Sequence, residues 1–115
     1  MTSPSDFVLV YTTAPDSGVA EAIGSQLVEE RLAACVNVLP KMRSIYIWQG
    51  EVQKDDEVVA LIKTRAAMAA KVIARIEDLH PYDVPAVFVL PTSGGSRDFQ
   101  SWVVEQTSTA CIEKP

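Results

Sequence analysis

The sequence predicts an α+β fold of the ferredoxin-like (split β-α-β) type, built on an antiparallel sheet. With 115 residues, the chain has the length of one domain and can bury a sizeable core. Apolar, β-branched stretches and stretches of helical periodicity follow the order strand, helix, strand, strand, helix, strand, which is the order of this fold. A short C-terminal helix follows, and we expect residues 1–115 to form a single domain.

The first strand and helix are the simplest elements to place. Residues 6–14, DFVLVYTTA, form a continuous apolar run that is typical of a strand buried on both faces. Asp16 and Ser17 are candidate N-caps for a helix over 19–34. Gly24 weakens that helix by roughly 1 kcal/mol relative to alanine, and a close neighbour is one reason for a glycine there. The apolar stripe of the helix comprises Val19, Ile23, Leu27 and Leu32.

The middle of the chain predicts two strands and a second helix. Residues 35–49 are strand-like, and Pro40 predicts a bulge or bend because proline cannot donate to a sheet ladder. The polar residues 50–57 are expected to form a hairpin connection whose acidic end is a solvated tip. Residues 58–64 predict another buried strand. The helix expected over 65–80 has apolar residues spaced by four, four and three: Met68, Val72, Ile76 and Leu79.

The end of the chain predicts one more strand and the short helix. The strand is expected over 84–90, and the helix carries Phe99 and Trp102 on one face, with Ser96 as its cap. Right-handed crossovers place the two longer helices on the same face of the sheet. The other face then needs a different cover.

Alternation along SIYIW, residues 44–48, shows that the second face is not polar. Ile45 and Ile47 point one way, whereas Tyr46 and Trp48 point the other way together with a serine. An apolar patch of this size is unusual on the surface of a monomer. We therefore predict a homo-oligomer with Tyr46 and Trp48 near the interface. The alternative is that the segment around Trp102 folds over this face within one chain.

Composition excludes several classes of function. The net charge of −5 argues against binding to nucleic acid or to anionic membranes, both of which need a basic surface. No segment approaches the roughly 20 apolar residues of a membrane span, and the start of the chain lacks the pattern of a secretory leader. Cys35 and Cys111 form no CxxC pair and are typical of reduced thiols, so we expect a cytoplasmic protein.

His80 is the only histidine of the sequence and lies in LHPYDVPAVFVLP, residues 79–91. An imidazole suits a metal ligand or a proton carrier. A metal site needs three or four ligands, so carboxylates or thiols from elsewhere, for instance from a neighbouring subunit, would have to complete it. The structural interpretation, which we favour, is that His80 lies in the last turn of a helix that Pro81 ends.

Other candidate sites are weaker. Lys63 and Thr64 at the end of a buried strand could meet an anion, as could the turn over 93–96, but neither has the glycine spacing of a phosphate loop. There is no G-x-S-x-G elbow, and Cys35 in an apolar strand is a poor nucleophile. We therefore predict that the protein is not an enzyme.

Three segments together resemble one family: residues 28–40 (VEERLAACVNVLP), 44–64 (SIYIWQGEVQKDDEVVALIKT) and 79–91. In this order and spacing they are similar to the CutA family of divalent-cation tolerance proteins, and the resemblance covers nearly the whole chain. It implies a ferredoxin-like fold and a homotrimer resembling PII signalling proteins. It also implies a non-enzymatic role in tolerance of copper and other divalent metals.

The resemblance also bears on individual residues. His80 matches the histidine of the family motif HPYxxP, which implies a weak, inter-subunit site for a divalent cation such as Cu²⁺, with carboxylates as further ligands. Family members usually carry glutamate at the position of Ala86, and some carry cysteine near the position of Thr12. No cofactor is otherwise implied.

The sequence also allows two functions other than metal tolerance. One is a PII-like regulator that binds a small anionic metabolite in clefts between subunits, with Lys63 and Tyr82 as candidate lining residues. The other is a stable trimeric scaffold that presents its surface to a partner.

Overall fold

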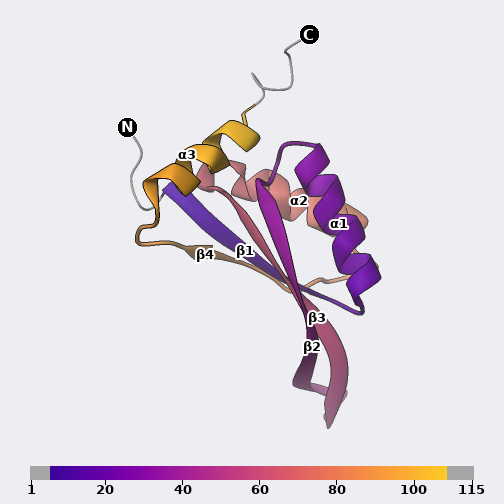
Figure 1. Cartoon of the computed structure of the whole chain (residues 1–115). Coiled ribbons are helices and arrows are strands. Elements are labelled where there is room, and N and C mark those ends of the chain that lie inside the picture. Colours follow the sequence, from indigo (N-terminus) through magenta and orange to yellow (C-terminus); the bar gives the residue numbers. More distant parts are fainter. Residues whose placement is uncertain (1–5, 109–115) are drawn as a thin grey trace.

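The computed structural model describes residues 6–108 and confirms the α+β fold (Figure 1). Four strands form one sheet in the order β2-β3-β1-β4, and every neighbouring pair is antiparallel. This is the sheet expected from the split β-α-β order. The elements are β1 (Phe7–Ala14), α1 (Ser17–Glu29), β2 (Cys35–Trp48), β3 (Glu51–Arg65), the 3-10 turn η2 (Ala66–Met68), α2 (Ala69–Leu79), β4 (Val87–Pro91) and α3 (Arg97–Gln106).

The main core lies between one face of the sheet and the helices α1 and α2. Alternate side chains of β1 and β3 point into it and meet the apolar stripes of both helices. Five of these side chains are fully inaccessible to solvent, so the predicted stripes are confirmed. The buried members of this core are Val8, Val10, Ile23, Leu27, Ala33, Ile62, Val72 and Ile76.

Helix α1 begins as predicted and ends earlier. The Asp16 carboxylate accepts a hydrogen bond from the Val19 N–H at 2.9 Å, which is an N-cap. A Cβ on Gly24 would lie 3.1 Å from a methyl carbon of Val36, so the close neighbour expected there is confirmed. The helix ends at Glu29 instead of continuing to residue 34, because Arg31 adopts a left-handed φ of 63° that turns the chain back toward the sheet.

The connection predicted over residues 50–57 is wrong for all but its first residue, because residues 51–57 belong to β3. Trp48 pairs with Glu51, and only Gln49 and Gly50 form the turn, with φ values of 52° and 82°. Positive φ at both central residues is the signature of a type I′ turn, whose twist matches that of a hairpin. Cross-strand pairing therefore overrides the low strand propensity of this charged segment.

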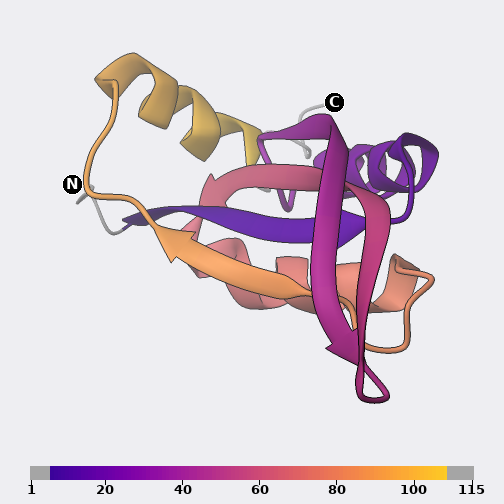
Figure 2. The ribbon, with the colours of Figure 1, turned by 90° about the horizontal axis from the view of Figure 1, so that it is seen from below.

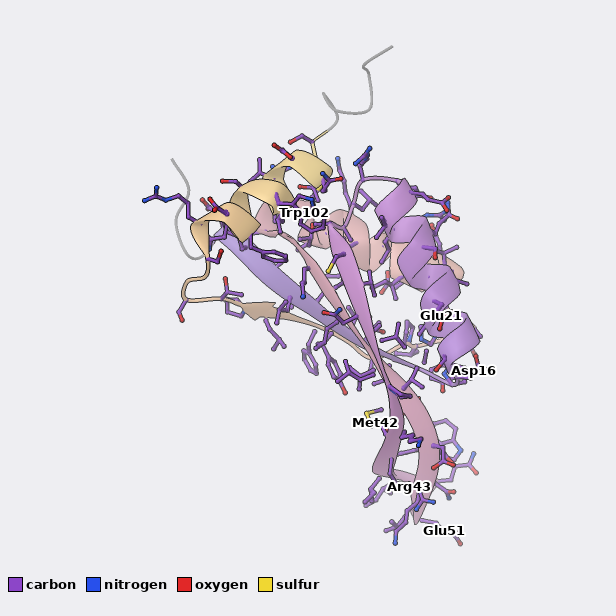
Figure 3. All side chains as sticks on the ribbon, viewed as in Figure 1. Asp16, Glu21, Met42, Arg43, Glu51 and Trp102 are labelled. Carbon is purple, nitrogen blue, oxygen red and sulfur yellow. The ribbon has the colours of Figure 1, made fainter. Side chains whose placement is uncertain are left out.

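The bulge predicted at Pro40 is confirmed, and it divides the β2-β3 hairpin into two parts. The register shifts between Leu39 and Met42, where Lys41 has a φ of 64°. Beyond the bulge, the hairpin projects away from α1 and α2; we call residues 42–57 the arm (Figure 1). Figure 3 places Met42, Arg43 and Glu51 along the arm.

Helix α3 covers only one end of the opposite sheet face. Val103 is buried against Phe7 and Ala34, and the Arg65 guanidinium donates to the Thr107 hydroxyl at 2.7 Å. Figure 2 shows α3 and α2 on opposite sides of β1. The cap predicted at Ser96 is confirmed by its bond to the Phe99 N–H at 3.3 Å.

Most of this second face stays uncovered within one chain. Phe88 on β4 is 69% exposed, and Leu39 and Leu90 on the same face are also exposed. The interpretation in which the segment around Trp102 covers the face within one chain therefore holds for one end only. None of the helices in the described part of the chain is long and apolar enough to span a membrane. Cys111 lies outside the described residues.

Candidate functional site

His80 ends α2 and ties it to the sheet. It is only 7% exposed, and its N–H donates to the Ile76 carbonyl at 2.8 Å. The backbone then turns to an extended conformation before Pro81, so the predicted helix end is confirmed.

The imidazole ring of His80 has a backbone partner at each nitrogen. Nε2 lies 2.7 Å from the Thr13 carbonyl oxygen, and Nδ1 lies 3.1 Å from the Tyr82 nitrogen. A carbonyl can only accept and an N–H can only donate, so the neutral ring carries its proton on Nε2 and accepts at Nδ1. A metal ion at Nδ1 would have to displace the Tyr82 N–H.

Thr12 and Ala86, the two positions at which the resemblance implied other residues, bond to each other. The Thr12 hydroxyl donates to the Ala86 carbonyl at 2.8 Å, and Thr12 is fully buried. Within residues 6–108, no group of three or more His, Cys, Asp and Glu side chains is arranged to hold a metal ion. A metal site that includes His80 therefore needs ligands from outside this part of the chain.

Tyr82 joins the loop after α2 to the arm. Its ring lies against that of His80 at a centroid distance of 4.6 Å, and its hydroxyl donates to Glu57 Oε2 at 2.8 Å. The Ser44 hydroxyl donates to the other oxygen of Glu57 at 2.6 Å. Burial and the bond to Glu57 raise the pKa of Tyr82 to about 12, since both disfavour the tyrosinate anion.

A second hydroxyl-carboxylate pair lies beside the first. The Tyr46 hydroxyl donates to Asp55, and this bond raises the pKa of Tyr46 because it is lost when the phenol ionises. Both pairs line a cleft of about 600 Å³ between the arm and the loop after α2, which we call the arm cleft. Its aromatic and acidic walls are Tyr46, Trp48, Tyr82, Asp55, Glu57 and Asp83.

Lys63 belongs to a different part of the molecule. It lines a cavity of about 170 Å³ between β1, β3 and α3, where its Nζ lies 5.3 Å from the centre of the Phe99 ring. Across the strands it pairs with Cys35, a half-buried free cysteine. Lys63 and Tyr82 line separate cavities, so the structure does not bring these two candidate lining residues together within one chain.

The carboxylates of the arm cleft are the residues that sequence reasoning missed. Residues 54–57 were expected to form a solvated tip, which hid the fact that Asp55 and Glu57 share a strand face. The available signal was alternation: Ser44 and Tyr46 point to one face of β2, and carboxylates two residues apart on the partner strand can meet them.

Ionisation of Tyr82 gives a direct test of this geometry. The folded-state pKa of about 12 lies above the usual 10, so the neutral phenol is favoured by folding. We expect the resulting stabilisation to be complete below about pH 10 and to be lost as the pH rises from 10 to 12. The difference in tyrosinate absorbance between wild type and Tyr82→Phe, followed as the pH rises, gives the titration of Tyr82 alone. Glu57→Gln is expected to lower the pKa of Tyr82. An ordinary midpoint for Tyr82 would contradict the contact with Glu57.

Comparison with known proteins places these features in a family context. The profile of the family described as CutA1 divalent ion tolerance protein matches residues 8–106. The divalent-cation tolerance protein CutA of Thermus thermophilus is 46% identical over 99 residues, which cover 86% of this chain and 96% of that protein. The crystal structure of CutA from Xylella fastidiosa is similar with a TM-score of 0.88 at 39% identity, covering 90% of this chain and 100% of that one.

The names of similar proteins differ in cellular compartment. A protein of Arabidopsis thaliana, 39% identical over 100 residues, is called chloroplastic, and this chain covers 55% of its length. A similar structure from Archaeoglobus fulgidus, with a TM-score of 0.86 at 32% identity, is described as a periplasmic divalent cation tolerance protein; it covers 89% of this chain and 99% of that one. These two relatives are thus named for different compartments.

Proposed function

This chain belongs to the CutA1 family of divalent ion tolerance proteins, and from that membership we propose that it acts in the response to divalent metal ions such as copper. The family match over residues 8–106 carries the proposal. The related protein of Thermus thermophilus is itself named for divalent-cation tolerance. The family is named for tolerance and not for a reaction, so the proposed role is non-enzymatic.

The proposed working form is a homotrimer built in the manner of PII proteins from one domain, residues 1–115. The uncovered sheet face and the arm support self-association, because apolar side chains are exposed on both. On the arm, Ile47 is 71% exposed and Trp48 62% exposed, although the two point to opposite faces. Contacts with neighbouring copies that bury Tyr46 and Trp48 would remove this surface from water.

The proposed metal ligand is His80, in a weak site that a neighbouring subunit completes. Its Nδ1 is the only ring nitrogen with a lone pair, and that lone pair accepts from the Tyr82 N–H. A metal ion that binds Nδ1 must first break this hydrogen bond. Its net binding free energy is therefore smaller than at a nitrogen whose lone pair has no partner, which agrees with weak binding. The proposed location is the cytoplasm, on the basis of the unclustered cysteines.

Calorimetric titration of Cu²⁺ into wild type and His80→Ala tests the metal site. We expect a weak binding event in wild type that the variant loses, with circular dichroism confirming that the variant is folded. Asp56→Asn is the control, because Asp56 pairs with Arg43 at 3.0 Å on the arm. Superimposable isotherms for wild type and His80→Ala would show that His80 is not a metal ligand. They would not affect the assignment of the chain to its family.

A further inference from the structure

A cavity lies under α3, at the end of the second sheet face that this helix covers. Its volume is about 170 Å³, and its walls come from β1, β3, the loop over residues 92–96 and α3. Figure 2 shows this loop leading from β4 to α3 at the end of the sheet. We call this space the α3 cavity. It is formed within one chain, and its walls include neither Tyr46 and Trp48 nor the apolar side chains of the uncovered part of the face.

The α3 cavity brings together two candidate anion sites of the sequence that are weak when taken alone. Lys63 lies on β3, and the turn over residues 93–96 precedes α3, yet both line this one space. They are neighbours because β1 pairs with β3 on one side and with β4 on the other. The tertiary structure therefore supplies a combination that spacing along the chain does not show.

The α3 cavity carries a positive charge. Lys63 is the only charged side chain among its lining residues, so no carboxylate in the walls neutralises the ammonium group. The salt bridges found within residues 6–108 do not involve Lys63 either. Its Nζ lies 5.3 Å from the centre of the Phe99 ring, and a ring face attracts a cation without removing its charge. Since an ammonium group has three N–H donors, this contact leaves donors for an anion.

The rest of the lining combines apolar residues with one amide. Phe7, Leu9 and Val103 are among the apolar residues that line the cavity. Gln100 adds a carboxamide, whose NH₂ group has two donors. A Cβ on Gly95 would lie 3.3 Å from Nε2 of Gln100, so the amide packs closely against the loop. Apolar cavities of about this size take up apolar groups in preference to water.

We propose that the α3 cavity binds a short-chain aliphatic carboxylate, with the carboxylate group at Lys63 and Gln100 and the hydrocarbon chain along the apolar walls. Phosphate fits this space less well, because apolar walls would strip water from its charged oxygens without replacing the lost hydrogen bonds. At about 30 Å³ for each water-sized group, the cavity holds roughly six groups, the size of a carboxylic acid of about four to six carbons. This proposal goes beyond metal tolerance and does not depend on it.

Sodium pentanoate is the probe that tests this site, added to the full chain with a chelator present so that metal plays no part. Sodium chloride is exchanged to keep the ionic strength constant. We expect saturable binding with a Kd on the order of 1 mM, followed by NMR shifts of the Gly94 and Gly95 amides. 1-Pentanol has a similar chain without the charge, and phosphate has charge without the chain. We expect each of these two to bind at least about tenfold more weakly than pentanoate.

Two lysines give a matched pair of variants. Lys63→Met removes the charge but keeps a side chain of similar length, and is expected to weaken pentanoate binding about tenfold. Lys71→Met removes the same charge from an exposed position on α2, which covers the other face of the sheet, and is expected to leave the Kd unchanged. Gln100→Glu places a like charge next to the bound carboxylate and is also expected to weaken binding at least about tenfold.

Three outcomes would overturn the proposal. Absence of saturable binding would show that the cavity takes no carboxylate, and equal losses in Lys63→Met and Lys71→Met would reduce the effect to net charge. Binding of 1-pentanol or phosphate with the affinity of pentanoate would reduce it to apolar contact or to general anion binding. Light scattering shows whether each variant keeps the mass of the wild type, and Gln100→Glu decides the question if Lys63→Met does not. None of these results affects the assignment of the chain to its family.

Discussion

Light scattering of the purified protein is expected to give three times the mass of one chain, and Ile47→Asp is expected to break this assembly. Ile47 is 71% exposed in the single chain and lies on the arm. A carboxylate placed in an apolar interface must lose its water without gaining a partner. We expect the concentration needed for assembly to rise by at least about a hundredfold, which corresponds to about 3 kcal/mol.

A matched substitution on α1 separates this effect from a general loss of solubility or folding. Val28 is also partly exposed, but it lies on α1 and not on the arm. Val28→Asp adds the same charge and is expected to leave the mass unchanged. A monomeric wild type at micromolar concentration would refute self-association, and a trimeric Ile47→Asp would show that the arm lies outside the interface.

His80→Ala is expected to lower the free energy of unfolding by about 2–4 kcal/mol even when a chelator has removed all metal. The substitution leaves the Thr13 carbonyl and the Tyr82 N–H without their partners, and each buried polar group that loses its hydrogen bond costs about 1–3 kcal/mol. It also removes the ring that lies against Tyr82. Chemical denaturation at a fixed chain concentration measures the loss, because the stability of an oligomer depends on concentration.

Tyr82→Phe is the control for this experiment. It keeps the ring next to His80 and removes only the hydroxyl that donates to Glu57, so we expect a loss of about 1 kcal/mol. A loss in His80→Ala no larger than that in Tyr82→Phe would contradict the structural role of the imidazole. A loss that appears only when metal is present would instead identify His80 chiefly as a ligand.

Local sequence patterns were sufficient to predict the part of this protein that forms the main core. The apolar stripes of the two longer helices, the caps at Asp16 and Ser96 and the bulge next to Pro40 were all predictable. Each depends on a residue and its neighbours a few positions away, through helical spacing, a hydroxyl or carboxylate at a cap, or a missing N–H. The uncovered second face was predictable for the same reason, since strand alternation places side chains on a face before any partner is known.

The arm and its cleft depended on tertiary structure. Residues 50–57 have the composition of a loop, and only their pairing with β2 makes them a strand that brings Asp55 and Glu57 toward tyrosine hydroxyls. The contact between His80 and Thr13 joins residues 67 positions apart, which no local pattern encodes. Local patterns along the chain therefore indicate which side chains face a core, which residues cap a helix and where a strand bends. Only the packing of distant segments decided which polar groups meet, because a hydrogen bond requires a donor and an acceptor within about 3 Å in space, whatever their separation along the chain.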